Sequence, residues 1–189
     1  HGYSVGGTQP YPQVPLSLID RIDYANDSVT ASSRGTLENA VSGNMGTFAS
    51  ADFGYICGGH SPQVPQYYSL TQRLEFANDT ATTSPKGNLS TGTGWGAGAG
   101  NQSYGYYSGG STPSKVSTVQ RLDYSSDTTT MAPKGPLSRV VNEHDAAGNA
   151  DYGYHAGGWD PSTPYATTND RIDYSNDTAT ALVRGILGL

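Results

Sequence analysis

The hexapeptide Gly105-Tyr106-Tyr107-Ser108-Gly109-Gly110 belongs to a pattern that recurs along the whole chain. Related copies begin at Gly2, Gly54 and Gly153, so successive copies are 52, 51 and 48 residues apart. Every copy opens with Gly-Tyr and closes with Gly-Gly. Self-similarity at a period of about 20–50 residues is the signature of repeat architectures. The sequence therefore predicts a chain built from four copies of one structural unit.

Two further markers follow each hexapeptide in the same order. The first is an Arg-x-Asp/Glu-aromatic block, at residues 21–24, 73–76, 121–124 and 171–174. The second is a basic residue before glycine, at residues 34–35, 86–87, 134–135 and 184–185. These markers divide the chain into units at about residues 1–38, 39–89, 90–137 and 138–189. We expect a single repeat domain over residues 1–189.

Within a unit the side chains alternate with a period of two, which is typical of β-strands. Ile22 and Tyr24 point to one side of the block at residues 21–24, and the two charged residues point to the other. The Ser-Asp or Asn-Asp pair after each block predicts a turn. The threonine-rich runs after it, residues 128–130 and 178–180 in the last two units, predict the next strand.

A fourth, inner strand is predicted just before the hexapeptide. Small residues fill this segment, as at residues 97–101 and 146–149, which indicates a place where backbones crowd together. Each unit thus supplies about four short antiparallel strands, the content of one β-propeller blade. The chain holds four copies of each of the other three strand types, but only three inner strands. Two explanations stay open: the missing strand lies outside residues 1–189, or a neighbouring subunit donates it.

The composition agrees with an all-β protein and excludes several classes. The chain has 25 Gly and 11 Pro, and only 14% of its residues are charged, against about 25% in average domains. The net charge of −6 and the absence of a basic run argue against nucleic acid as a partner. No apolar stretch approaches the roughly 18 residues of a membrane helix, so we expect no membrane insertion. The one cysteine, Cys57, permits neither an internal disulfide nor a cysteine zinc site.

The order of strands in the four units resembles a kelch repeat. Gly58-Gly59 stands for the kelch glycine doublet, and Asp123-Tyr124 for its tyrosine-containing strand. The outer-strand tryptophan common in kelch repeats is absent. The sequence of residues 171–180, which follows a Gly-Tyr-x-x-Gly-Gly segment, is also similar to kelch-like repeats in predicted structural proteins of marine cyanobacterial phages. The resemblance implies an all-β, kelch-like β-propeller, and the four repeats form either a small ring or part of a larger one; the strand count leaves the ring incomplete or completed by a borrowed strand.

We find no residue pattern that predicts catalysis, a cofactor or a metal site. The four histidines lack the spacing of metal ligands. We expect residues 143–145, Glu-His-Asp, to form a solvated loop, and His155 to be a packed strand residue. Cys57 occupies a slot held by small residues in other units and is expected to fill the core. Trp95 is interpreted as a local insertion in a strand.

The recurring charged residues are expected to be structural. We expect the arginines of the four blocks to pair with carboxylates on the same or the next blade. The residues concerned are Arg21, Asp23, Arg73, Glu75, Arg121, Asp123, Arg171 and Asp173. Asn-x-Ser/Thr triplets make Asn26, Asn78 and Asn176 candidate glycosylation sites, although turn geometry alone also explains them.

The loops after the Gly-Gly pairs differ between units and are rich in proline and aromatic residues. We expect them to gather on one face, where aromatic side chains suit protein partners or sugar rings. The candidate contact residues are Tyr11, His60, Tyr67, Tyr68, Trp159 and Tyr165. The expected function is a non-enzymatic structural or adhesive module of a virion or extracellular fibre, with copies of itself or other structural proteins as partners. The alternative is a carbohydrate-binding, lectin-like propeller with glycans as partners.

Overall fold

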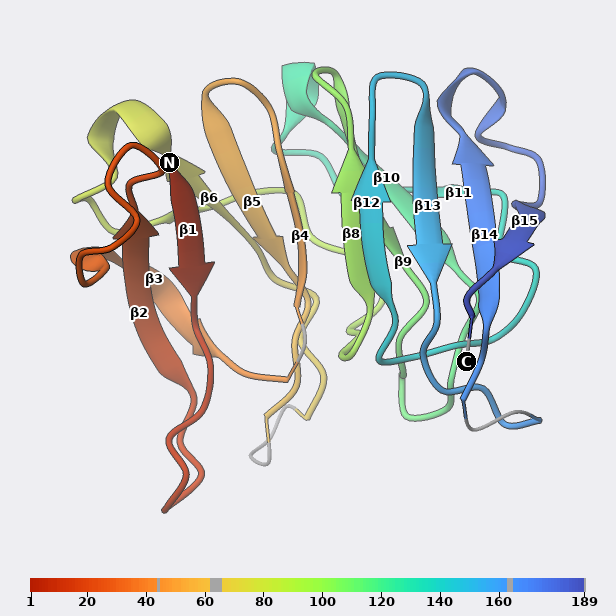
Figure 1. Ribbon diagram of the computed structural model, residues 1–189, viewed down its shortest axis with the longest axis horizontal. Coiled ribbons are helices and arrows are strands. Elements are labelled where there is room, and N and C mark those ends of the chain that lie inside the picture. The colour runs from red at the N-terminus through yellow and green to blue at the C-terminus, as the bar shows by residue number, and fades with distance from the viewer. Residues whose placement is uncertain (44, 62–65, 163–164, 189) are drawn as a thin grey trace.

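The chain folds into four antiparallel sheets that stand side by side in an open row (Figure 1). The computed structural model describes residues 1–43, 45–61, 66–162 and 165–188. The sheets follow one another in chain order, with the N-terminal sheet at one end of the row and the C-terminal sheet at the other. Over the described ranges, no strand pairing joins the two end sheets. The architecture is therefore all-β and propeller-like, without closure into a ring.

The sheets are simple up-and-down meanders whose strands lie in sequence order. Sheet 1 contains β1 (Gly2–Val5), β2 (Leu16–Ile22) and β3 (Ser32–Val41), and sheet 2 contains β4 (Gly46–Ala49), β5 (Phe53–Cys57), β6 (Thr71–Glu75) and β7 (Ser84–Pro85). Sheet 3 contains β8 (Ala97–Gly100), β9 (Tyr104–Ser108), β10 (Val119–Asp123) and β11 (Ala132–Lys134). Sheet 4 contains β12 (Asp145–Gly148), β13 (Tyr152–Ala156), β14 (Thr168–Asp173) and β15 (Leu182–Ile186). Short 3-10 helices follow the third strand of sheets 2 to 4, at Phe76–Asn78, Tyr124–Ser126 and Tyr174–Asn176.

Sheet 1 lacks the inner strand, as the strand count predicts. In the other three sheets the inner strands β4, β8 and β12 lie against one another along the row. Among the described residues no strand pairs with the second edge of β1. A mostly apolar hollow of about 270 Å³ lies there, lined by residues that include Val5 of β1 and Phe48 of β4. Sheet 1 therefore presents an unpaired edge beside an apolar hollow.

The inner strand β8 consists of small residues because its backbone touches that of β4. A Cβ atom added at Gly98 in β8 would lie 2.5 Å from the backbone oxygen and 2.7 Å from the backbone nitrogen of Thr47 in β4. The flanking Ala97 and Ala99 are buried. The prediction of a crowded inner strand at residues 97–100 is confirmed.

The threonine-rich runs are not strands, and that prediction is wrong. Residues 128–130 lie in the turn after a 3-10 helix, and the outer strand β11 begins only at Ala132. The chain first crosses to the preceding sheet, where the carbonyl oxygen of Asp127 accepts a hydrogen bond from the N–H of Gly87 at 2.7 Å. Met131 donates its N–H to the carbonyl of Asn88 in the same way. The run therefore links two sheets before the chain turns back into its own.

The hydrophobic core lies in the three junctions between neighbouring sheets. Each junction holds one cluster of buried side chains and, at equivalent positions, a stacked aromatic pair. The pairs are Tyr3–Phe76, Tyr55–Tyr124 and Tyr106–Tyr174, with ring centroids 5.3, 4.9 and 4.7 Å apart. In each pair the second aromatic residue comes from the Arg-x-Asp/Glu-aromatic block. No helix in the described part of the chain has the length and hydropathy to cross a membrane.

Candidate functional site

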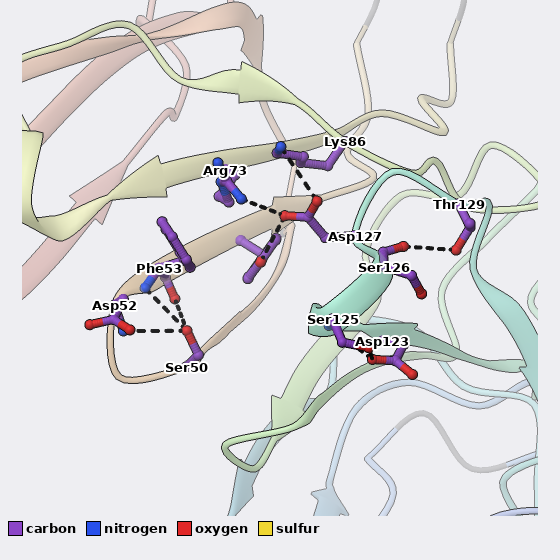
Figure 2. A network of polar contacts seen from close by, with 11 residues as sticks. Ser50, Asp52, Phe53, Arg73, Lys86, Asp123, Ser125, Ser126, Asp127 and Thr129 are labelled. Carbon is purple, nitrogen blue, oxygen red and sulfur yellow. Dashed lines mark hydrogen bonds and ion pairs between the residues drawn. The ribbon is translucent and has the colours of Figure 1, made fainter.

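Each junction also contains one buried aspartate, which we call the junction aspartate. Between sheets 2 and 3 this residue is Asp127 (Figure 2). Its carboxylate accepts hydrogen bonds from Arg73 Nη1 at 2.7 Å and from the Tyr55 hydroxyl at 3.0 Å. Lys86 Nζ lies 3.4 Å from the other carboxylate oxygen. Together with the Gly87 N–H on its carbonyl, four groups of sheet 2 converge on one residue of sheet 3.

The other two junctions repeat this arrangement with equivalent residues. Tyr3, Arg21 and Arg34 surround Asp79, and Tyr106, Arg121 and Lys134 surround Asp177. The strand register explains the convergence, because Tyr106 lies directly opposite Arg121 and both side chains point to the same side. Burial tends to raise the pKa of Asp177, but the hydrogen bonds from Tyr106 and Lys134 and the charge of Arg121 hold this pKa below its usual range.

The arginines of sheets 1 to 3 thus pair with an aspartate of the next sheet rather than with the acidic residue of their own block. Three of those acidic residues instead accept the backbone N–H two positions later, namely Asp23, Asp123 and Asp173. Glu75 is exposed. Arg171 forms no ion pair within the described residues, and its guanidinium lies 4.1 Å from the centroid of the Tyr152 ring.

The described residues of the loops after the Gly-Gly pairs lie at one end of the sheets, the lower end in Figure 1, which we call the loop face. A pocket of about 540 Å³ opens on it, lined by residues that include Trp95, Lys115, Asn142, Glu143 and Trp159. Lys115 Nζ lies 3.0 Å from the centroid of the Trp159 ring. Two indoles beside an ammonium, an amide and a carboxylate suit a polar ligand that also offers a flat apolar face.

Two residues of this pocket have a strained backbone. Trp95 and Glu143 have φ angles of 58° and 54°, and among the described residues they are the non-glycine residues with positive φ. Both occupy the repeat slot that Gly43 fills in sheet 2 with a φ of 66°. The left-handed region costs about 1–2 kcal/mol for a residue with a Cβ atom, and such strain clusters at functional sites. A hydrogen bond from the Glu143 N–H to the Trp95 carbonyl at 2.8 Å ties the two residues together.

Aromatic contacts extend the pocket wall toward sheet 2. The His60 ring stacks on Trp95 at 4.1 Å, and the Tyr67 ring meets Trp95 edge-on at 5.9 Å. Of the predicted contact residues, His60 and Tyr67 therefore border the pocket, and Trp159 lines it.

The remaining three predicted contact residues lie elsewhere. Tyr68 packs against the buried cluster between sheets 1 and 2. Tyr11 and Tyr165 are exposed on their loops, and neither has a ring contact with a residue that the structure describes. The expected single cluster of loop aromatics thus includes only part of the predicted set.

Four pocket residues were not predicted from the sequence. Lys115, Asn142 and Glu143 gave no chemical signal, and Trp95 was interpreted as part of a strand. Trp95 instead lies at a bend before β8. Alignment of the repeat units could have found two of the four, because a large side chain stands in a glycine slot at both Trp95 and Glu143.

A second polar cluster lies buried beside the inner strands. Ser108 Oγ is 3.0 Å from His144 Nε2 and 2.7 Å from His155 Nδ1. The expectation of a solvated His144 is wrong, because this residue directly precedes β12 and its side chain turns inward toward β9. His155 is packed in its strand, as expected. Ser108 has no accessible surface, so a substrate does not reach its hydroxyl, and the cluster is a buried polar network.

Cys57 is fully buried, and this burial raises the pKa of its thiol to about 12, so the side chain stays protonated. Over the described ranges, no three His, Cys, Asp or Glu side chains are grouped so that they could hold a metal ion. The candidate glycosylation residues Asn26, Asn78 and Asn176 are exposed; Asn26 lies at a bend after β2, and Asn78 and Asn176 end the 3-10 helices that follow β6 and β14.

The two buried histidines make the stability depend on pH. Burial, with the charge of Arg139 nearby, lowers the pKa of His144 to about 4, and burial next to His144 lowers the pKa of His155 to about 3. Unfolded histidine has a pKa near 6.5, so the unfolded chain binds protons first as the pH falls. We expect the free energy of unfolding to be constant above about pH 6.5 and to fall below it, by up to about 1.4 kcal/mol per pH unit for each histidine.

Urea denaturation at pH 7 and pH 5 measures this slope above the range in which carboxylates titrate. The variant His155→Asn keeps a polar group near Ser108 and removes one titrating ring, so its slope between these pH values is expected to be about half. An equal free energy of unfolding at the two pH values in the unmodified chain would contradict the assignment.

No protein-family model matches this chain, and no curated protein matches it. Among solved structures, the chain is similar to the structure of YjhT, with a TM-score of 0.77 and a sequence identity of 12%. The similar region covers 98% of this chain and 68% of the YjhT chain. At this identity the similarity concerns the fold, and it supports the propeller-like arrangement of the sheets.

Proposed function

We propose that this protein is a non-enzymatic adhesive module of a virion or extracellular fibre that makes its contacts through the loop face. The observation that carries the proposal is the strained pair Trp95 and Glu143 in the wall of the loop-face pocket. In one copy of this slot Gly43 adopts the left-handed backbone, and the two large side chains adopt it in the other copies at a cost in backbone energy. Their place at the mouth of an open pocket indicates a contact role. The virion or fibre setting follows from the resemblance of the repeats.

A carbohydrate ligand is the second candidate, favoured by the chemistry of the same pocket. Trp159 is partly exposed, and aromatic faces stack on the apolar faces of sugar rings. Lys115, Asn142 and Glu143 offer donors and acceptors around it for hydroxyl groups. The pocket volume of about 540 Å³ lies in the range of small-molecule sites.

The test combines a glycan array with binding to intact cell surfaces. For the carbohydrate candidate we expect Trp159→Ala to weaken binding of the best array glycan at least about tenfold, because the stacking platform is lost. The matched control is Tyr165→Ala, which removes an exposed aromatic residue of the same loop and should leave binding unchanged. Isothermal titration gives the dissociation constants.

The outcomes separate the two candidates. A silent array with surface binding that depends on Trp95 and Trp159 favours adhesion to a protein surface. Surface binding that neither tryptophan affects would contradict any contact role for the pocket.

We further infer that the four sheets are kelch-type blades and that the unpaired edge of β1 is the place for an inner strand. Support comes from the small residues of the inner strands β8 and β12 and from the apolar hollow beside β1. The strand comes either from residues outside 1–189 or from a neighbouring subunit.

A further inference from the structure

The two ends of the row carry the two unused halves of a fourth junction. Sheet 1 has Asp27 in the slot of the junction aspartates, and this residue is exposed. Sheet 4 has Tyr154, Arg171 and Arg184 in the slots that surround a junction aspartate elsewhere. Neither Asp27 nor the two arginines form an ion pair within the part of the chain that the structure describes. An acidic group at one end of the molecule thus complements a basic group at the other.

The Tyr154–Arg171 part of the basic half has the same geometry as its equivalent in sheet 3. Tyr154 lies directly opposite Arg171 in the pairing of β13 with β14, as Tyr106 lies opposite Arg121 in sheet 3. The Arg171 guanidinium lies 4.1 Å from the ring centroid of Tyr152, and the equivalent distance from Arg121 to Tyr104 is 4.2 Å. Arg121 holds Asp177 from this position, so Arg171 needs no rearrangement to hold a carboxylate.

The end of sheet 1 exposes apolar side chains whose equivalents are buried or half-buried in every other sheet. Tyr24 is 70% exposed, whereas the equivalent Tyr174 is 8% exposed and stacks on Tyr106 of the preceding sheet. Ile22 is 40% exposed, and the equivalent Leu122 has no exposed surface. Sheet 1 therefore presents a face shaped to cover a preceding sheet.

The end of sheet 4 exposes the matching surface. Leu187 is 44% exposed, whereas its three equivalents, Leu37, Leu89 and Leu137, are each 2% exposed. A Cβ atom at Gly135 would lie 2.0 Å from the Ala179 carbonyl oxygen of the next sheet, but at the equivalent Gly185 it would meet nothing within 4 Å. Sheet 4 thus keeps the glycine that lets another backbone approach, with open space in front of it.

We propose that the end of sheet 4 binds the end of sheet 1 of a second copy of this chain, head to tail. Asp27 of the second copy lies between Tyr154, Arg171 and Arg184, and its carbonyl accepts the N–H of Gly185. Tyr24 of the second copy stacks on Tyr154, and its Ile22 covers the exposed apolar surface of sheet 4. The contact repeats the three junctions within the chain, residue for residue.

The occupant is a second copy because each end face matches the other in charge, hydrophobicity and backbone approach. A partner of unrelated sequence would need to reproduce an aspartate turn, an aromatic ring and an aliphatic side chain in this register. The contact uses the flat ends of the row, leaves the loop face open, and is independent of the proposed function.

Sedimentation velocity of the 189-residue chain over a wide range of concentrations tests the proposal. We expect the unmodified chain to self-associate and Asp27→Lys to weaken association more than about tenfold, because the introduced ammonium would face Arg171 and Arg184. Arg171→Glu should weaken it similarly, since the introduced carboxylate would face Asp27. The control Glu75→Lys makes the same charge change on an exposed side chain of an interior sheet and should associate like the unmodified chain.

Mixing the two defective variants gives the sharpest result. The mixture pairs the intact Asp27 of one variant with the intact Arg171 of the other, so we expect the two variants to associate with each other although neither associates with itself. Circular dichroism checks the fold of each variant, and the exposed Arg184→Glu replaces Arg171→Glu if that variant is unfolded. A monomeric unmodified chain, unaffected association of Asp27→Lys, or a mixture that stays monomeric would each overturn the proposal. If the unmodified chain is monomeric and Asp27→Lys lowers its free energy of unfolding, the contact forms between the two ends of one chain instead.

Discussion

Replacing Asp127 with alanine is expected to lower the free energy of unfolding by about 3 kcal/mol. The substitution leaves the guanidinium of Arg73, the ammonium of Lys86 and the hydroxyl of Tyr55 around an empty position between two sheets. Removing one partner of a buried ion pair costs about 3–5 kcal/mol, and the 24% exposure of the Arg73 side chain places the loss at the lower end. Urea denaturation at pH 7, at a protein concentration where the chain is monomeric, measures the change.

Asp27→Ala is the matched control for this prediction. It makes the same substitution in the same repeat slot, but on an exposed side chain at the end of the row. We expect a change below about 0.5 kcal/mol, as for most surface substitutions. Equal losses for the two variants would show that the aspartate acts within its own turn and not across the junction.

Gly98→Ala is expected to destabilise the protein by about 2–3 kcal/mol although it adds only one methyl group. The new Cβ atom would lie 2.5 Å from the backbone oxygen of Thr47, so relief requires a shift of β4 or β8 rather than a rotamer change. These strands form the inner edges of two sheets, and their separation sets how closely the sheets approach. Thermal and urea denaturation both report the loss.

The control for this second prediction is Gly188→Ala, where an added Cβ atom meets nothing within 4 Å. A stability close to that of the unmodified protein is expected there. If Gly98→Ala is equally neutral, the inner strands have room to separate, and the crowding of backbones does not explain their small residues.

Much of the fold could be predicted because every unit repeats the same local signals. The period-two alternation and the Gly-Gly pairs predict the strands, and the small residues predict the inner edge. The location of the ion pairs could not be predicted in the same way. Arg73 has an aspartate shortly after its own block, at Asp79, and another in the next unit, at Asp127, and identical repeats make both partners equally plausible in the sequence. In the structure Arg73 pairs with Asp127, because its side chain faces the next sheet.

The pocket was harder to predict than the sheets, because it forms from parts of the units that do not repeat. Trp95, Lys115 and Trp159 come from different loops, and nothing periodic in the sequence relates them. The exposed Tyr11 and Tyr165 carry the same compositional signal as Trp159 but do not join the pocket. The prediction that the threonine-rich runs form strands was wrong for another reason. Their β-propensity is high, but hydrogen bonds to the preceding sheet, such as Gly87 to Asp127, hold them in turns.

The repetition of one aspartate in every junction also determines the order in which the sheets unfold. Each sheet touches only its neighbours, so the stability is a sum of nearly equal nearest-neighbour contributions along one dimension. Sheets 2 and 3 are held on both sides, whereas sheets 1 and 4 are each held on one. Local opening therefore starts at the two ends and moves inward, and backbone amides in sheets 2 and 3 exchange their hydrogens with solvent most slowly.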